Sequence, residues 1–529
     1  MMSCTTYRIL KPSQVTAVAC RRSALCLGMR YSTTSANPVE DHSQMSNVKS
    51  MDQIPGPKGL PFIGTLLEYA KNDGWGFQNF FAMTEKRRQE YGPIYKETIG
   101  NNRMIVVSTS EDAEKLLRAE GKYPNRNPVA PLVEYRKKRN LSMGVSFSKD
   151  KEWKKFRSVM DKKMMRPHEV TCYSDRINDV CDDLIQRLKR CRGNDGVIPD
   201  IEKEINKYTT ESIATVLFEK RLGMFKEPIE PKTEQFYQSI TKIFEATNAI
   251  LTIPPFVFKY IFTKHWKELI KWGDIASEFA DDIIEEKRKQ IEKKIASNDD
   301  ITRSNDRVDF LTYVIATGKL SRREANVAMM ELLFGGVDTA ATTILWTLYN
   351  LGKNPHVQDK LRSEVRSVME DCKEPDTSLI EKMPYLRSCV KETLRLQPIA
   401  FALPRITDSD LVLSGYKVPA KTLVMIASYV MGRDESAFPN PSQYMPERWL
   451  RGSDRQGYNS DSRFQYLPFG FGPRMCIGKR VAEMEIHTLL SKLILEHEIK
   501  TMNPTENTLV NRLVMAAKDK MIIALNDLK

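Results

Sequence analysis

A glycine-rich segment around one cysteine, PFGFGPRMCIG at residues 468–478, constrains this chain more than any other feature. Its three glycines let the backbone turn tightly or let a flat molecule approach it closely. The following residues, 477–499, show the periodicity of an amphipathic helix, so Cys476 is expected at a helix N-terminus. Arg474 lies just before it, and a cation and a helix N-terminus each lower the pKa of a thiol. The segment therefore predicts a thiolate in a roomy loop.

The chemistry of Cys476 follows from its surroundings. A lone cysteine most often fills a protein core as an inert side chain. No histidine that could act as a base lies close to Cys476 in sequence, so the pattern favours a metal ligand over a nucleophile. A haem iron held by a proximal thiolate fits such a site.

Length and composition indicate one large globular domain. The chain has 529 residues, of which 41% are hydrophobic and 28% are charged. A stiff proline-rich entry at 54–65 opens a segment, 54–529, that no Gly/Ser linker, repeat or low-complexity block interrupts. Helical periodicity dominates residues 150–400, and strand-like segments are short. We expect a mainly α fold with a minor β region, whose strands fall at 93–99, 103–108 and 410–419.

Residues 1–35 have the composition of a mitochondrial transit peptide. Several arginines and lysines precede Glu40, the first acidic residue, and serine and threonine are frequent. We expect cleavage near Tyr31 and interpret residues 36–53 as a polar linker. A disordered basic tail is the alternative. The segment contributes part of the formal net charge of +13.

Other patterns argue against several classes of protein. The nine cysteines are scattered without paired spacing and the six histidines lack metal-ligand spacing, which disfavours a disulfide framework and a structural zinc site. The sequence contains no run of about 18 apolar residues that would predict a transmembrane helix. It also lacks the basic helix or aromatic platform that would predict nucleic-acid binding.

The segment 321–355 predicts a long helix that is apolar almost all round and therefore buried. Asp338 and Thr339 are polar residues within it, and burying polar side chains costs free energy, so we expect them to have a function. Gly335 and Gly336 weaken the helix, and the Thr339 hydroxyl can reach the carbonyl one turn earlier. We expect the helix to bend there and to open a groove. A kinked core helix without a functional role is the alternative.

Five residues of the cysteine segment match the haem-binding signature of the cytochrome P450 family in every fixed position: Phe469, Gly472, Arg474, Cys476 and Gly478. The resemblance extends from about residue 54 to the end of the chain. It implies the cytochrome P450 fold, haem b as the cofactor, Cys476 as the ligand of its iron and monooxygenation as the reaction.

The resemblance also implies roles for residues outside this segment. One group forms a buried triad of salt bridges that stabilises the core: Glu392, Arg395 and Arg448. A second group contacts the haem propionates: Trp153, Arg157, Arg405 and Arg474. Asp338 and Thr339 match the oxygen-activation motif, in which the threonine holds a hydrogen-bonded water and the aspartate supplies protons. Ala340 departs from the second threonine that is common in that motif.

Several features resemble the mitochondrial cytochromes P450 that oxidise sterols, steroids and secosteroids, among them VLFEKRLGMF at 216–225. We expect an external electron donor, because the chain shows no flavin or nicotinamide domain. Basic residues match the positions that dock an adrenodoxin-type ferredoxin, which an NADPH-dependent reductase serves: Arg387, Lys391, Lys479 and Arg480. A solvated pair of charges without a partner is the alternative.

The apolar segment 250–262 resembles the loop between helices F and G of the family, which lies near the substrate entrance. We expect it to give peripheral contact with the matrix side of the inner mitochondrial membrane. A buried hydrophobic segment is the alternative.

Together these features predict a haem-thiolate monooxygenase that acts on a small lipophilic substrate of the sterol, steroid or secosteroid class. A mitochondrial enzyme acting on xenobiotics stays open, since neither the substrate nor the oxidised carbon follows from the sequence. Two rival functions are a haem-thiolate isomerase that needs no electrons and a non-catalytic sensor. Asp338 and Thr339 disfavour the isomerase.

Overall fold

A computed structural model describes residues 48–73, 79–100, 102–251, 253–261, 263–296, 308–370, 372, 374–452 and 463–528. These residues belong to one unit that begins at Val48. The transit peptide expected at 1–35 and the first part of the expected linker, 36–47, lie outside the described residues.

The linker predicted to end at residue 53 does not extend that far. The amide of Lys49 donates to the carbonyl of Gly415 at 3.0 Å, and the amide of Lys417 donates to the carbonyl of Lys49 at 2.8 Å. Met51–Gln53 then forms one turn of 3-10 helix. Residues 48–53 are therefore packed on the folded unit, because their main chain extends the β4–β5 hairpin.

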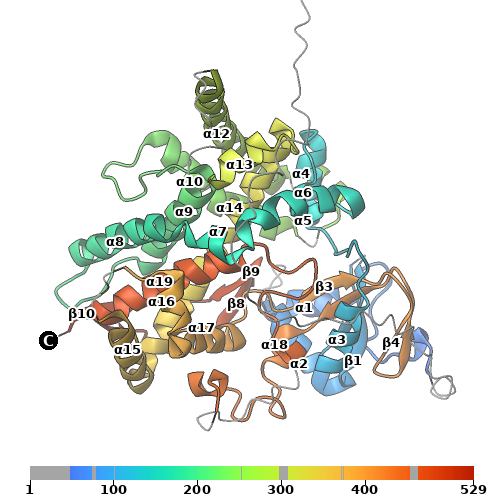
Figure 1. Ribbon diagram of the computed structural model, residues 1–529. Coiled ribbons are helices and arrows are strands. Elements are labelled where there is room, and N and C mark those ends of the chain that lie inside the picture. The colour runs from blue at the N-terminus through green and yellow to red at the C-terminus, as the bar shows by residue number, and fades with distance from the viewer. Residues whose placement is uncertain are drawn as a thin grey trace, which may run out of the picture. The chain divides into compact units, whose positions relative to one another are not determined.

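The described elements confirm the mainly α class with a minor β region (Figure 1). The helices are α1 (Leu66–Asp73), α2 (Phe80–Tyr91), α3 (Ser110–Arg118), α4 (Ala130–Lys138), α5 (Gly144–Phe147), α6 (Asp150–Met164), α7 (Pro167–Thr171), α8 (Ser174–Cys191), α9 (Ile201–Phe218), α10 (Pro231–Ile250), α11 (Pro255–Tyr260), α12 (Thr263–Ala296), α13 (Phe310–Ala316), α14 (Arg322–Lys353), α15 (Pro355–Met369), α16 (Thr377–Glu381), α17 (Pro384–Leu396), α18 (Ser428–Met431) and α19 (Lys479–Glu496). The strands are β1 (Ile94–Ile99), β2 (Asn102–Val107), β3 (Leu403–Ile406), β4 (Leu411–Leu413), β5 (Tyr416–Val418), β6 (Leu423–Ile426), β7 (His497–Thr501), β8 (Leu509–Arg512), β9 (Val514–Ala517) and β10 (Ile523–Asp527).

The strands form one four-stranded sheet and three two-stranded ones. The larger sheet has the order β1-β2-β6-β3, in which β2 and β6 run parallel and the other neighbours run antiparallel. The three strand-like segments of the sequence correspond to β1, β2 and the β4–β5 hairpin. Figure 1 shows β1, β3 and β4 beside α1, α2, α3 and α18, with most helices on the other side of the unit.

Helix α14 is the central helix of the unit. It begins with a capping box, in which the Ser321 hydroxyl accepts from the amide of Glu324 at 3.3 Å and the Glu324 carboxylate accepts from the amide of Ser321 at 2.8 Å. Its sides pack on α9, α12, α17, α19 and β7. Within the described residues it is the one helix long and apolar enough to cross a bilayer, and its burial inside the unit makes it a core helix. Its apolar circumference is explained by these neighbours.

Candidate active site

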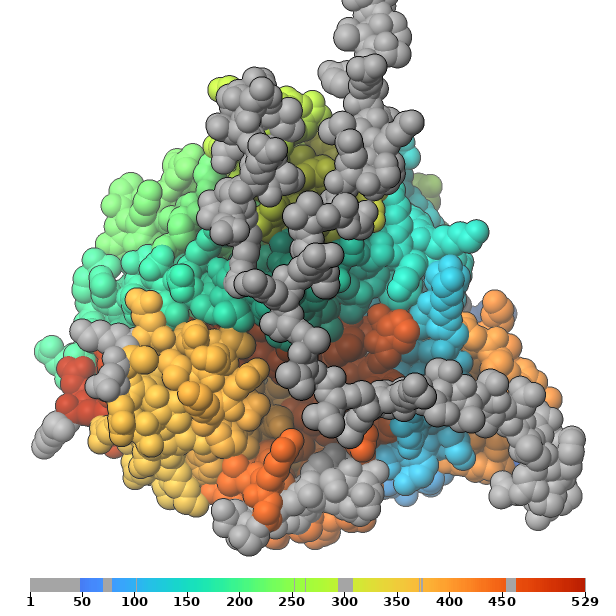
Figure 2. Space-filling model, viewed as in Figure 1, coloured from blue at the N-terminus to red at the C-terminus, as the bar shows by residue number. Residues whose placement is uncertain are grey.

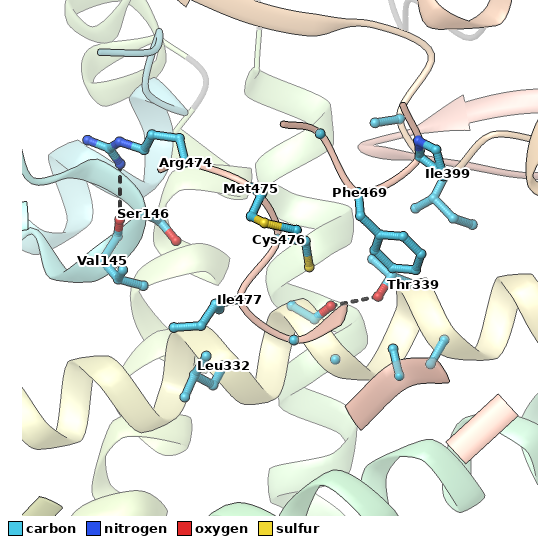
Figure 3. A pocket seen from close by; sticks show the side chains of 18 of the residues that line it. Val145, Ser146, Leu332, Thr339, Ile399, Phe469, Arg474, Met475, Cys476 and Ile477 are labelled. Carbon is cyan, nitrogen blue, oxygen red and sulfur yellow. Dashed lines mark hydrogen bonds between the residues drawn. The ribbon is translucent and has the colours of Figure 1, made fainter. Parts of the chain in front are cut away.

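A cavity of about 450 Å³ lies between α14 and the cysteine segment. Gly335, Gly336 and Thr339 of α14 line one wall, and Cys476 lies on the other (Figure 3). Most of the remaining lining is apolar. Its basic residues come from the segment before α4, from α6, from β3 and from the cysteine segment, and its two acidic residues, Glu331 and Glu485, come from α14 and α19.

Two turns of the cysteine segment present the sulfur to this cavity. Gly470 and Gly472 have φ values of +68° and +74°, which favour glycine. The amide of Cys476 donates to the carbonyl of Phe469 at 2.8 Å, and the amide of Met475 donates to that of Gly472 at 3.1 Å. Helix α19 starts at Lys479, so the expected place of Cys476 just before a helix is confirmed.

The predicted lowering of the Cys476 pKa is wrong. Burial raises the pKa of this thiol, and hydrogen bonds from the amides of Gly478 and Lys479 together with the charges of Arg157 and Arg126 oppose the rise only in part. The helix N-terminus acts as expected, but the cations that act most strongly are not Arg474. The sequence did not show that the accessible surface of the sulfur faces an internal cavity rather than bulk water.

Four arginines line the cavity: Arg126, Arg157, Arg405 and Arg474. Arg474 donates to the carbonyls of Pro124 at 2.8 Å, Val145 at 3.2 Å and Ser148 at 2.8 Å, and its guanidinium lies 4.5 Å from the centre of the Trp153 ring. Burial, followed by the charges of Arg126, Arg405 and Arg157, lowers the pKa of Arg474 to about 9. The cavity therefore carries an excess of positive charge.

Arg126 is a cation of the cavity that no sequence pattern predicted. Its Nε and Nη2 atoms donate to the carbonyl of Ser146 at 3.2 and 3.1 Å. Burial and the charge of Arg405 lower its pKa. No local pattern distinguishes Arg126 from the other basic residues, because only the fold brings it beside Arg405 and Arg474.

The other two arginines have carboxylate partners. Arg157 donates to the carbonyl of Met475 at 2.8 Å and forms an ion pair of 2.5 Å with Asp161. Arg405 forms an ion pair with Glu120. Within the described parts of the chain, Arg126 and Arg474 instead donate to main-chain carbonyls, and neither pairs with a carboxylate.

These residues fit haem. The cavity offers one thiol as a metal ligand and two arginines that lack a carboxylate partner, and an iron porphyrin with two carboxylates needs both. The family model described as Cytochrome P450 matches residues 54–524. The chain belongs to the cytochrome P450 family. It is accordingly a haem b monooxygenase, and its mainly α fold is that of the family.

Relatives extend over nearly the whole chain. Cytochrome P450 10 of Lymnaea stagnalis is 34% identical, covering 95% of this chain and 90% of its own. The mitochondrial cholesterol side-chain cleavage enzyme of Rattus norvegicus is 32% identical, covering 90% and 88%. The mitochondrial 1,25-dihydroxyvitamin D(3) 24-hydroxylase of the same species is 31% identical, covering 87% and 86%. This cytochrome P450 is thus homologous to mitochondrial steroid and secosteroid hydroxylases.

Asp338 and Thr339 of this cytochrome P450 face different cavities. The Thr339 hydroxyl donates to the carbonyl of Gly335 at 2.7 Å, as predicted, and Thr339 lines the cavity with Cys476. Asp338 lines a second cavity of about 250 Å³ together with Asn206 and Trp346. Burial raises the pKa of Asp338 to about 6. The peptide between the two residues separates a polar cavity from the haem cavity.

The structure brings Glu392, Arg395 and Arg448 together, and their side chains are fully buried. Arg395 contacts both oxygens of Glu392 at 2.8 and 2.9 Å, and Arg448 contacts one at 2.9 Å. The Trp449 indole and the amide of Met445 donate to the same carboxylate at 2.9 and 3.0 Å. The remaining arginine donors bond carbonyls of residues 432–443. The network is fully hydrogen-bonded, which a buried charge requires.

The four basic residues predicted to dock a ferredoxin also lie together. The charges of Lys479, Arg480, Lys391 and Arg387 all lower the pKa of Glu483, although burial raises it overall. Lys391 and Arg480 are exposed, whereas Arg387 and Lys479 are half-buried. Helix α17 thus turns Lys391 to solvent and Glu392 to the core. Figure 2 views the molecule from the side on which α15, α16 and α17 form the yellow-orange area.

Replacing Arg448 by Met should lower the free energy of unfolding by about 3–5 kcal/mol, because Glu392 loses a partner in a buried network. Urea unfolding followed by circular dichroism measures this loss. Lys360→Met is the control, since Lys360 pairs with Glu447 at 2.8 Å but is exposed, and its loss should cost less than about 1 kcal/mol. Equal effects of the two variants would contradict the assigned importance of burial.

Asp338→Asn should stabilise the protein in a pH-dependent manner. The pKa of Asp338 is raised from 3.8 to about 6, so the native state is penalised only where the carboxyl must ionise. The advantage of the variant should be absent below pH 4, grow between pH 4 and 6, and reach about 3 kcal/mol above pH 6. The measurement is urea unfolding of both proteins at several pH values. A difference that does not change with pH would contradict the burial of this carboxyl.

Proposed function

We propose that this cytochrome P450 is a mitochondrial enzyme that hydroxylates a sterol, steroid or secosteroid with O2 and electrons from an adrenodoxin-type ferredoxin. In this proposal Cys476 binds the iron within a loop that includes Phe469, Gly472 and Gly478. The haem carboxylates are held by Arg126, Arg157, Arg405 and Arg474, with Trp153 packed against Arg474. The observation that carries it is the opening of the Cys476 sulfur into a cavity with two arginines that lack carboxylate partners.

Bound haem supplies the activation of O2 and the insertion of an oxygen atom into a C–H bond. The protein supplies placement and protons. The Thr339 hydroxyl hydrogen is held by the carbonyl of Gly335, which leaves the oxygen lone pairs free to accept a hydrogen bond in the cavity. Asp338, on the other side of the peptide, has a pKa of about 6, so it can take up and release a proton near neutral pH.

A group of four basic residues supports the proposal that the electron donor is acidic: Arg387, Lys391, Lys479 and Arg480. Lys479 and Arg480 begin α19, directly after the segment that carries Cys476. A partner seated on this basic group would lie close to the segment that carries Cys476. Long-range attraction between such surfaces raises the rate of encounter and weakens with salt.

Exposed apolar side chains near α11 support peripheral contact with the matrix side of the inner membrane. Phe256 is 66% exposed, Tyr260 80% and Ile261 71%. Three large apolar side chains of one short segment facing water are typical of a surface that meets lipid. The alternative of a buried segment holds only for neighbours such as Phe258, which is fully buried.

The mitochondrial location and the substrate class rest on the relatives. Two of them are named mitochondrial enzymes, one for cholesterol side-chain cleavage and one for 24-hydroxylation of 1,25-dihydroxyvitamin D(3). The apolar lining of the haem cavity suits substrates of this kind.

Cys476→Ala should abolish the thiolate-type absorption of the reduced carbon monoxide complex, because the variant has no sulfur to bind the iron at this position. Cys172→Ala is the matched control. Cys172 lies between α7 and α8, outside the lining of the haem cavity, and donates to the carbonyl of His168. Absorption spectra of the reduced complexes make the comparison. Survival of the thiolate-type band in Cys476→Ala would refute the ligand.

Lys391→Glu should raise the ferredoxin concentration needed for half-maximal turnover by about tenfold at low salt, because one attractive charge becomes repulsive. Substrate binding, followed by the substrate-induced spectral shift, should not change. Lys360→Glu on α15 is the control, because Lys360 is exposed but lies outside the basic group. If Lys391→Glu needs the same ferredoxin concentration as the unmodified enzyme, the docking proposal is wrong.

A further inference from the structure

A short segment, Met143–Ser148, packs beside α14 at the wall of the haem cavity, and we call it the strap. It contains α5, and its main chain bonds charged side chains on both sides. On the cavity side, Arg474 donates to the carbonyls of Val145 and Ser148, and Arg126 donates to the carbonyl of Ser146. The two arginines without carboxylate partners are therefore both held by the strap.

The amides of the strap are held by Glu331 of α14, which also lines the cavity. The amide of Val145 donates to Glu331 Oε2 at 2.6 Å, and the amide of Ser146 donates to its carboxylate oxygens at 3.2 Å. The side chain of Glu331 is only 4% exposed and pairs with Arg136 at 2.7 Å. Arg136 also donates to the carbonyl of Met143. A buried carboxylate thus anchors the strap through its amides.

One peptide group joins the two sides directly. The peptide between Val145 and Ser146 directs its N–H to Glu331 and its C=O to Arg474, so its dipole lies favourably between an anion and a cation. Figure 3 shows Arg474 reaching the main chain of Val145. The charge of Glu331 also raises the pKa of Arg126. Moving the carboxylate would therefore disturb both arginines.

Gly144 makes this arrangement possible. Its φ is +63°, and a Cβ built on it would lie 2.3 Å from Glu331 Oε2. Any other residue would push the strap away from the carboxylate, since the carboxylate is also fixed by Arg136.

We propose that Glu331 is a positioning residue, which sets Arg126 and Arg474 for the haem carboxylates through the peptide groups of the strap. The inference rests on the proposed role of these arginines in holding haem. Glu331 lies one helical turn before Gly335, so the same turn of α14 that lines the cavity also sets the cations around the cofactor.

The test measures the rate at which haem passes from the holoenzyme to apomyoglobin. Glu331→Gln should accelerate this transfer about tenfold, because replacing a residue that orients a direct contact commonly weakens binding by about that factor. Glu134→Gln is the control, because Glu134 of α4 pairs with Lys137 on the same helix and with Lys259 on α11, and its replacement should leave the rate unchanged. An unchanged rate in Glu331→Gln would overturn the proposal.

Repeating Glu331→Gln in the Arg126→Ala variant distinguishes an effect through the arginines from a general loss of stability. If Glu331 acts through the arginines, its replacement in Arg126→Ala should accelerate transfer by only about threefold, since one of the two arginines is already gone. An equal tenfold effect in both backgrounds would indicate an independent structural role and overturn the proposal. Arg126→Ala alone should also accelerate transfer. If it does not, the haem-holding role of Arg126 fails, whereas failure of Glu331→Gln alone overturns only the positioning role.

Gly144→Ala provides a second test of the strap if Glu331→Gln does not fold. This variant retains the carboxylate but displaces the strap, so haem transfer should accelerate as in Glu331→Gln. A rate equal to that of the unmodified enzyme would contradict the strap.

Discussion

Positive charge inside a cavity that excludes bulk water is the constraint around which this structure is organised. Four arginines and one thiol share the lining, and only Arg157 and Arg405 have carboxylate partners. A guanidinium removed from water needs hydrogen bonds or an anion. Main-chain carbonyls satisfy Arg126 and Arg474 in part, and burial, followed by the charges of neighbouring arginines, lowers the pKa of both. In our proposal, the two carboxylates of haem would supply the missing negative charge.

Helix α14 divides the interior into two environments. Thr339 faces the haem cavity and Asp338 faces a polar cavity, so one peptide group separates the haem cavity from the residue that we propose supplies protons. Gly336 allows this helix to approach α9, since a Cβ there would lie 2.9 Å from the side chain of Ile213. The same helix carries Glu331, which links the wall of the cavity to its cations.

Helix α17 combines stability with access for a partner. Its buried face carries Glu392 and Arg395, whose network of hydrogen bonds ties α17 to residues 432–449. Its exposed face carries Lys391, which joins the cations around Glu483 on α19. The buried network therefore holds rigid the surface that we propose receives electrons.

Patterns between residues close in sequence were sufficient for much of this protein. The glycines around Cys476, the bond from Thr339 to Gly335 and the segments that form β1, β2 and the β4–β5 hairpin all depend on neighbours within a few positions. The match to the haem-binding signature is likewise local, and it identified the family before any contact was known. Local sequence determines such features because short-range hydrogen bonds and helical periodicity are set by adjacent residues.

Only the tertiary structure decided which charges meet. Arg126, Glu120 and Glu331 are separated from their partners by long stretches of chain, and nothing near them in sequence marks them as functional. The predicted low pKa of Cys476 was wrong for the same reason, since burial depends on every segment that surrounds the sulfur. The sequence alone thus determined the family, the mainly α class and the monooxygenase chemistry, and it predicted Cys476 as the ligand. The fold decided the balance of charge and solvation around that ligand, because electrostatic energies depend on distance in space and on exclusion of water.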